Sequence, residues 1–273
     1  MRGALSPLEA WSKYDAMESR LTACVSERML DLARLGPGMS VLDLASGRGE
    51  PALRAASRVG PLGQVIGVDT SDELLDLARR EAAKERLSNV SFRATDAETL
   101  DRVVGDHARF DAALSRWGLM YMQRPLSVLM NVRASLRPHG PFVVALWAEP
   151  ERVPWAMFTR RVLAHFCDLP RLDSNVPGAF RYADPSAIER DFGAAGFSIE
   201  RIEELTVSVL ECATGAGVVD WCIDLGFARP AEQLASAEQS AFLRSLLAAA
   251  EELQEGGMFR LGGVTRLVLA RVS

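Results

Sequence analysis

The sequence is poor in cysteine and has none of the spacings that bind metal. Its four cysteines form no C-x-x-C pair, and no histidine is spaced with them as in a zinc site. We therefore expect reduced, mostly buried thiols and no metal centre. A chain of 273 residues is long enough to bury a stable core without disulfides.

Runs of positive charge are also absent. The chain has 31 basic and 36 acidic residues, which gives a net charge of −5. Proteins that bind DNA or RNA usually carry a basic stripe that displaces counterions from the phosphates. We therefore expect no nucleic-acid partner.

Long apolar runs are the third absence. No segment approaches the length that spans a membrane, and the N-terminal residues lack the apolar core of a signal peptide. We expect a cytoplasmic protein without membrane attachment. The balance of 48% apolar and 25% charged residues is that of an ordinary globular protein and does not indicate an oligomeric state.

Short apolar segments alternate with longer amphipathic ones in the first half of the chain. The apolar segments predict strands at residues 40–45, 64–69, 90–93, 110–115 and 142–147. The amphipathic segments predict helices at residues 7–35, 50–59, 71–84 and 125–136. This alternation is typical of an α/β fold, a mostly parallel sheet with helices on both faces.

The regular alternation ends after residue 147. A helix is expected at residues 184–195, a strand at 197–209, two or three helices within 211–255 and a last strand at 264–270. We predict a single domain overall. It consists of an N-terminal helical lid segment (1–35), a ligand-binding core (36–150), and lid insertions with the last strands of the sheet (151–273).

A glycine turn joins the first predicted strand to the helix that follows. Gly47 and Gly49 let the backbone turn sharply and approach a ligand closely. A dinucleotide site would have a third glycine where this chain has Ala52. Glu50 would repel a pyrophosphate, and Pro51 removes an amide donor. The turn therefore favours a cationic, zwitterionic ligand over NAD.

Two carboxylates follow the next two strands. Asp69 stands 20 residues after Gly49, where a carboxylate can accept both hydroxyls of an unmodified ribose. Asp96 follows the third strand and can accept an adenine amino group, while the Ala97 amide can donate to a ring nitrogen. Each aspartate could instead simply cap a helix.

Four stretches together resemble a known family: residues 41–53, 67–71, 96–98 and 115–120. Their order and spacing are similar to those of the class I, Rossmann-like methyltransferases that use S-adenosylmethionine (SAM). The similarity is greatest to the small-molecule branch related to ubiquinone and menaquinone methylation, and it covers residues 38–150. It implies a seven-stranded sheet whose last, antiparallel strand is inserted, with residues 197–209 and 264–271 as strands six and seven.

The resemblance also implies roles for residues of the donor site. The glycines would line the methionine part of SAM, Asp43 would help to hold its amino group, and Ser115 and Arg116 would lie beside the methionine and sulfonium. The residues expected to bind the donor are Asp43, Ala45, Ser46, Gly47, Gly49, Asp69, Thr70, Asp96, Ala97, Ser115 and Arg116. Ala45 stands where many members have glycine, and its methyl group is tolerated if φ stays below zero.

Methyl transfer is an in-line displacement that depends mostly on alignment and exclusion of water. If the acceptor must lose a proton, His165 is the best candidate base and Tyr14 a weaker one. Large apolar side chains near the expected pocket could bind the acceptor or simply pack in the core. They are Trp11, Trp117, Met120, Trp147, Trp155 and Phe166.

The sequence thus predicts an enzyme that methylates oxygen, nitrogen or carbon of a small organic acceptor. We expect this acceptor to be an apolar, aromatic or natural-product metabolite of secondary metabolism. The methyl donor would be S-adenosyl-L-methionine and the product S-adenosyl-L-homocysteine. Two alternatives stay open. One is an NAD(P)-dependent oxidoreductase on a similar sheet, and the other is a SAM-binding protein without transferase activity, such as a regulator or a cyclase-like enzyme.

Overall fold

The computed structural model describes residues 3–100 and 110–273, except for the side chains of Pro7 and Trp11. The chain divides into two compact units, each assembled from separate stretches. The sheet unit comprises Ala23–Ala148, Asp173–Leu205 and Thr265–Ser273. The helical unit comprises the chain up to Thr22, Glu149–Leu172 and Thr206–Val264. The first boundary falls inside helix α1 (Pro7–Leu32), whereas the predicted segment 1–35 ends after it.

The strand order confirms the predicted α/β fold. The order is β3-β2-β1-β4-β5-β8-β6, with β1 to β5 parallel and β8 antiparallel to β5. The strands are β1 (Ser40–Leu44), β2 (Gln64–Asp69), β3 (Val90–Ala94), β4 (Ala112–Arg116), β5 (Pro141–Trp147), β6 (Phe197–Cys212) and β8 (Met258–Val272). Because the strands are parallel, the carboxyl ends of β1, β2 and β4 lie at the same end of the sheet, which is where ligands bind in such sheets.

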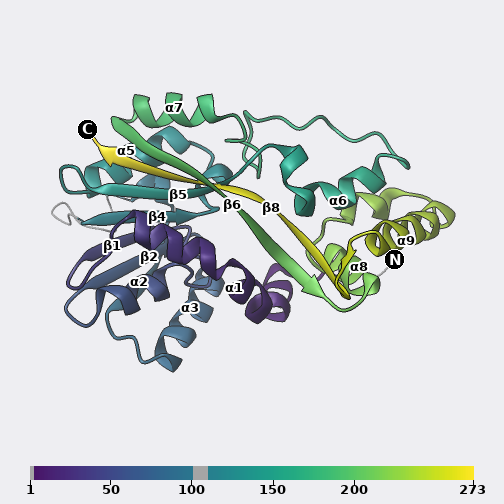
Figure 1. The fold of residues 1–273 in the computed structure, drawn as a ribbon, viewed down its shortest axis with the longest axis horizontal. Coiled ribbons are helices and arrows are strands. Elements are labelled where there is room, and N and C mark those ends of the chain that lie inside the picture. Colours follow the sequence, from purple (N-terminus) through teal and green to yellow (C-terminus); the bar gives the residue numbers. More distant parts are fainter. Residues whose placement is uncertain (1–2, 101–109) are drawn as a thin grey trace. The chain divides into compact units, whose positions relative to one another are not determined.

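Helices cover both faces of the sheet unit (Figure 1). The helices α2 (Ala52–Val59) and α3 (Asp72–Lys84) pack on one side, and α5 (Pro125–Ser135) and α7 (Pro185–Ala194) lie together on the other. In α3, residues 75, 78 and 82 are buried at helical spacing, and the Ser71 side chain caps its start. The central strand β5 is buried along its whole length.

The helical unit contains α6 (Pro154–Leu163), α8 (Gly215–Asp224) and α9 (Ser236–Glu251). The expectation of two or three helices within 211–255 is therefore met by α8, the short helix η4 (Arg229–Gln233) and α9. The predicted start of the last strand at residue 264 is wrong, because β8 begins at Met258 and pairs with a short strand, β7 (Gln254–Glu255). Gly256 and Gly257, both at positive φ, make the two-residue hairpin turn between them.

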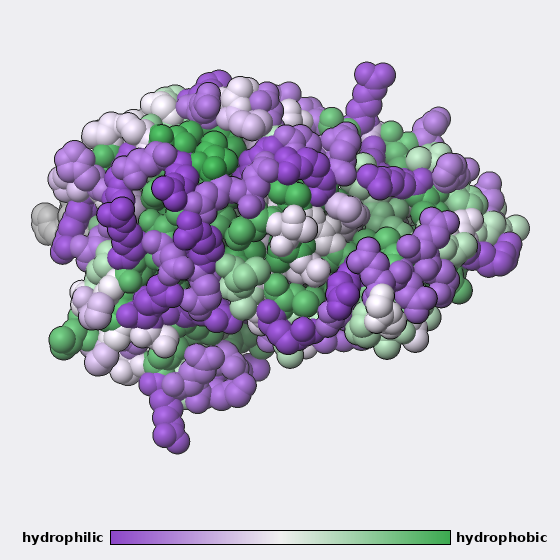
Figure 2. All heavy atoms as spheres, in the orientation of Figure 1, coloured by the Kyte–Doolittle hydropathy of each residue, from purple (hydrophilic) through white to green (hydrophobic). Residues whose placement is uncertain are grey.

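Hydrophilic side chains are spread across the face seen in Figure 2, with smaller hydrophobic groups between them. Ion pairs lie within each unit: Arg28 pairs with Glu203 in the sheet unit, and Arg20 and Arg260 both pair with Glu211 in the helical unit. Among residues 3–100 and 110–273, no helix combines the length and apolar character that a membrane crossing requires.

Candidate functional site

The turn after β1 runs through three residues with positive φ. Ala45, Gly47 and Gly49 have φ values of 54°, 51° and 98°. The Gly49 amide donates to the Ser46 carbonyl at 2.8 Å, and the Ser46 amide donates to the Val68 carbonyl at 2.9 Å. We expected the Ala45 methyl group to be tolerated if its φ were negative, but the φ of Ala45 is positive. The closing turn forces this residue into the left-handed region that L side chains rarely adopt.

The space beside the Ala45 methyl group comes from Gly118, which follows β4. A β-carbon on Gly118 would lie 2.3 Å from the β-carbon of Ala45. Gly118 itself has φ −100°, which other residues can also adopt. Glycine is therefore needed there for its small size and not for its backbone conformation. The alanine in the turn thus depends on the glycine opposite.

Asp69 lies at the end of β2 and holds the turn. Its Oδ2 accepts a hydrogen bond from the Gly47 amide at 2.9 Å, and its Oδ1 accepts one from the Ser71 amide at 2.9 Å. The neighbouring Thr70 is exposed. One carboxylate therefore fixes both the glycine turn and the start of α3, and it keeps further acceptor capacity for a ligand hydroxyl.

Asp96 caps the short helix η1 (Ala97–Thr99), because its Oδ1 accepts from the Glu98 amide at 2.8 Å. Its carboxylate is exposed, whereas the Ala97 side chain is buried. The Ala97 carbonyl accepts from the Asn131 side chain of α5 at 3.2 Å. The structure thus shows the helix cap that was the alternative interpretation, and it leaves the second Asp96 oxygen on the surface.

Three buried polar side chains lie near the carboxyl ends of β1 and β4. The side-chain oxygens of Asp43, Ser46 and Ser115 have no hydrogen-bond partner among the described residues. All three residues are at most 1% exposed. Leaving such groups unsatisfied is costly, so a ligand that satisfied them would be bound favourably. A positively charged group with several N–H donors, such as the amino group of SAM, fits these acceptors.

Burial, with a smaller contribution from the nearby Glu50, raises the pKa of the Asp43 carboxyl to about 7. Ser46, Arg116 and the Ala52 amide favour the ionised form, but the contacts of Ser46 and Ala52 fall short of hydrogen-bond geometry. A cationic ligand would supply the missing stabilisation of the charge.

Two arginines add positive charge in the same region. Burial and the nearby Arg116 lower the pKa of the Arg48 guanidinium to about 10. The Arg116 guanidinium lies over the Trp117 ring, 5.0 Å from its centroid. Arg48, between the two glycines of the turn, is a site residue that the sequence analysis missed, although its position in the motif was a usable signal.

Two predicted acceptor residues, Trp117 and Trp147, stack at the ends of β4 and β5. Their ring centroids are 4.6 Å apart and the rings are nearly parallel, at 11°. The Trp117 indole N–H donates to Thr265 Oγ1 at 2.9 Å, and that hydroxyl donates to the Leu146 carbonyl. Met120, in the short helix η2 (Leu119–Tyr121), is fully buried. These three residues lie in the sheet unit.

The other predicted residues lie in the helical unit. The Tyr14 hydroxyl donates to Asp224 Oδ2 at 2.6 Å, and the Lys13 ammonium contacts the same oxygen at 2.6 Å. His165 is exposed just after α6. Trp155 packs on Phe227 and Phe166 packs edge-on against Phe242. The side chain of Trp11 lies outside the described part of the structure.

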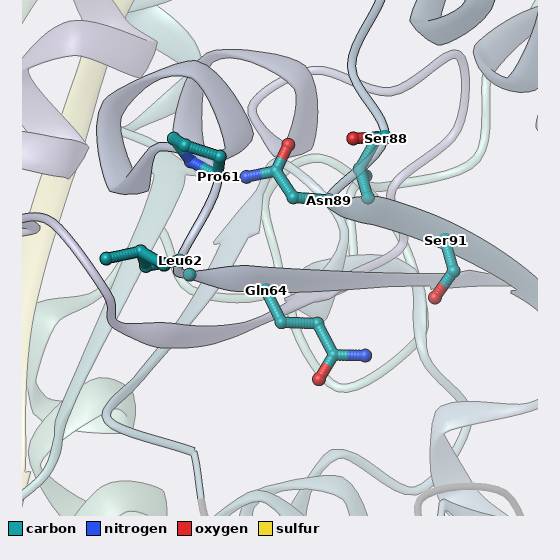
Figure 3. Close-up of a pocket in the computed structure, with 8 residues that line it drawn as sticks. Pro61, Leu62, Gln64, Ser88, Asn89 and Ser91 are labelled. Atoms are coloured by element: carbon teal, nitrogen blue, oxygen red, sulfur yellow. The ribbon is translucent and has the colours of Figure 1, made fainter.

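A separate hollow of about 410 Å³ lies at the opposite, amino ends of β2 and β3 (Figure 3). It is lined by residues 61–64 and 88–91, half of them polar. Asn89 there donates to the carbonyls of Ala56 and Gly60, so its amide supports the loop. Within the described residues, no group of His, Cys, Asp and Glu side chains is placed to hold a metal ion.

Comparison with known proteins agrees with this geometry. A family model described as a methyltransferase domain matches residues 35–179, more than half of the chain. The nocamycin O-methyltransferase of Saccharothrix syringae is 30% identical over 194 residues, which cover 67% of this chain and 68% of that protein. The demethylmenaquinone methyltransferase of Lactococcus lactis is 31% identical over 147 residues, 51% of this chain and 56% of that protein.

Solved structures share the fold at lower identity. A SAM-dependent methyltransferase from Aquifex aeolicus superposes with a TM-score of 0.57 at 17% identity, covering 96% of this chain and 98% of that one. The [4+2]-cyclase SpnF gives a TM-score of 0.54 at 20% identity, covering 90% and 80%. The resemblance to the small-molecule and quinone methyltransferases is confirmed. The chain therefore belongs to the methyltransferase family, as a class I member with the Rossmann-like sheet of the SAM-dependent enzymes.

Proposed function

We propose that the protein transfers a methyl group from SAM to an oxygen of a small, largely apolar acceptor. The observation that carries the donor assignment is the cluster of buried acceptors Asp43, Ser46 and Ser115, which lacks partners within the described residues. An ammonium group of the donor would satisfy these acceptors. The choice of oxygen rests on the related nocamycin enzyme, which is an O-methyltransferase by name.

The chain's own residues then have separate tasks. Asp69 would accept the ribose hydroxyls while it holds the Gly47 amide. The free side of Asp96 and the Ala97 amide would bind the adenine. Arg116, fixed over Trp117, would pair with the donor carboxylate. Ala45, Gly49 and Thr70 would contact the donor through the turn and the start of α3.

When bound, SAM supplies a methyl group made electrophilic by its sulfonium. The protein contributes alignment and exclusion of water, which together are worth up to about 7–11 kcal/mol of the barrier. Where the acceptor oxygen carries a proton, His165 would remove it, with Tyr14 as the second candidate. A positioned base would add about 10²–10⁴ in rate.

The acceptor itself is proposed to be flat and apolar. The stacked pair of Trp117 and Trp147, together with the buried Met120, supports this choice. Trp155 and Phe166 are proposed as further acceptor-binding residues, and the helical unit as a lid. The assignment of Trp11 stays a prediction from the sequence. The acidic net charge supports an acceptor other than nucleic acid. A cytoplasmic location stays part of the proposal. The natural-product relative supports a place in secondary metabolism.

Two measurements test the proposal. Calorimetry with S-adenosylhomocysteine should show binding to the wild-type protein that is lost in Asp43→Ala. Incubation with methyl-labelled SAM and a panel of phenols, enols and carboxylic acids should transfer label to at least one of them. Failure to bind the product would refute the donor site.

A second candidate is a SAM-binding protein that catalyses no transfer, because the chain shares its fold with the cyclase SpnF. Binding of S-adenosylhomocysteine without label transfer to any acceptor would favour that candidate.

A further inference from the structure

The glycine turn is anchored on a second side by the residue that follows Gly49. Both carboxylate oxygens of Glu50 are held: Oε1 accepts from Arg54 Nε at 2.7 Å, and Oε2 accepts from Ser26 Oγ at 2.8 Å. Ser26 is fully buried, and the Glu50 side chain is 17% exposed. A charged group held by two donors in such surroundings is tightly fixed.

The two anchors come from different helices of the sheet unit. Ser26 belongs to α1, and Arg54 belongs to α2, one turn beyond Glu50. Further ion pairs between the two helices follow from Glu50 toward the surface. Glu27 pairs with Arg54 at 3.1 Å and with Arg58 at 2.6 Å. The last is the exposed pair of Arg58 and Asp31. These ion pairs form a row between α1 and α2, called here the ladder, and its buried end lies at the turn.

Without such an anchor, the backbone of the turn would sample several conformations. Gly47 and Gly49 have no side chains, and glycine loses the most conformational freedom when it is ordered. Asp69 fixes the Gly47 amide from β2, and Glu50 fixes the far end of the turn from α1 and α2. Ordering the turn before the ligand arrives lowers the cost of binding.

We infer that Ser26 and Glu50 are positioning residues that hold the donor-binding turn in its binding conformation before SAM arrives. This inference rests on the proposed function, since it assumes that the turn binds the methyl donor. Neither residue needs to contact the donor. Their effect should appear in donor affinity and in the mobility of residues 45–50.

The test uses the full chain and three matched variants. Ser26→Ala removes one anchor and leaves the charge of Glu50. Glu50→Gln keeps an oxygen for Ser26 and removes the charge paired with Arg54. Asp31→Asn breaks the outer end of the same ladder, about one helical turn further along each helix, and is the control. The measurements are calorimetry with S-adenosylhomocysteine and hydrogen exchange of a peptide spanning residues 44–53.

We expect Ser26→Ala and Glu50→Gln to weaken binding about tenfold each, the equivalent of one lost hydrogen bond. Both should speed amide exchange in residues 44–53, whereas Asp31→Asn should change affinity less than about twofold. Unchanged affinity in folded Ser26→Ala would overturn the inference. Weaker binding without faster exchange would do the same, because the turn would then be no more mobile than in the wild type.

A failure of the proposed function is distinguishable from a failure of this inference. If the wild-type protein does not bind S-adenosylhomocysteine, the donor assignment is wrong. The exchange measurement still compares Ser26→Ala with Asp31→Asn in that case. Equal exchange in the two variants would then reject the anchoring role as well.

Discussion

The Gly47 amide donates to Asp69 Oδ2 at 2.9 Å, which joins the end of β2 to the turn after β1. The same carboxylate receives the Ser71 amide at the start of α3. Its position thus sets both the path of the glycine turn and the place where a ribose would bind. Binding and local stability should therefore fail together when Asp69 is replaced.

Asp69→Ala should lower the free energy of unfolding by about 2 kcal/mol, because two backbone amides lose a charged acceptor. It should also abolish detectable binding of S-adenosylhomocysteine. Chemical denaturation and calorimetry measure the two effects. The matched control is Asp76→Ala on α3, which breaks only an exposed ion pair with Arg79 and should cost less than about 0.5 kcal/mol.

Donor binding should depend on pH through Asp43. Its pKa of about 7 in the free protein means that a cationic ligand must displace a proton below that pH. The Kd of S-adenosylhomocysteine should therefore rise about tenfold per pH unit below 7 and stay flat from pH 7 to about 8. Asp43→Asn should weaken binding at pH 8 and remove this dependence.

Asp43 should also affect the stability of the free protein. Its folded pKa lies above the value of about 3.9 expected in the unfolded chain. The free energy of unfolding should therefore fall as pH rises from about 4 to 7 and then level off. Asp43→Asn should remove this component from the pH profile. A profile that is identical in wild type and variant would show that the carboxyl titrates normally.

Gly118→Ala should destabilise the protein by about 1–3 kcal/mol, because its new methyl group meets that of Ala45. Ala45→Gly should stabilise the protein by up to about 1 kcal/mol, since glycine adopts positive φ without strain. The double variant should recover most of the loss. Denaturant unfolding of the wild type, the two single variants and the double variant gives the coupling energy between positions 45 and 118. If the two single effects simply add, the two methyl groups are not in direct contact.

Tyr14 and His165 should behave differently when each is replaced. Tyr14→Phe should cost about 1 kcal/mol of stability, because the buried Asp224 carboxylate loses one donor. His165→Gln should leave stability within about 0.5 kcal/mol, since the imidazole is exposed. With a protonated acceptor, we expect His165→Gln to lower kcat by at least about 10². A larger loss of kcat in Tyr14→Phe than in His165→Gln would show that Tyr14, and not His165, is the better candidate for the base.

The five parallel strands could be predicted to within a few residues. Each is a short apolar run between turn residues, and burial on both faces leaves this local pattern in the sequence. The start of α2 was placed two residues early, at Glu50 instead of Ala52. The hairpin at Gly256 and Gly257 had a clear local signal that was overlooked.

The rest of the site depends on contacts between distant residues. Ser26 and Glu50 are 24 positions apart, and Lys13 and Asp224 are 211 apart. Neither pair leaves a periodic or short-range pattern. The positive φ of Ala45 was equally hidden, because it follows from how the turn closes and not from the residue itself.

Each of the two compact units is built from three stretches of polypeptide. Neither can be excised as a continuous piece, and no single truncation separates one from the other. An engineer who wished to exchange the helical unit for that of a relative would have to graft three inserts at once. The same interleaving means that a single crossover between two parental genes would produce a chimera with mixed parentage in at least one unit.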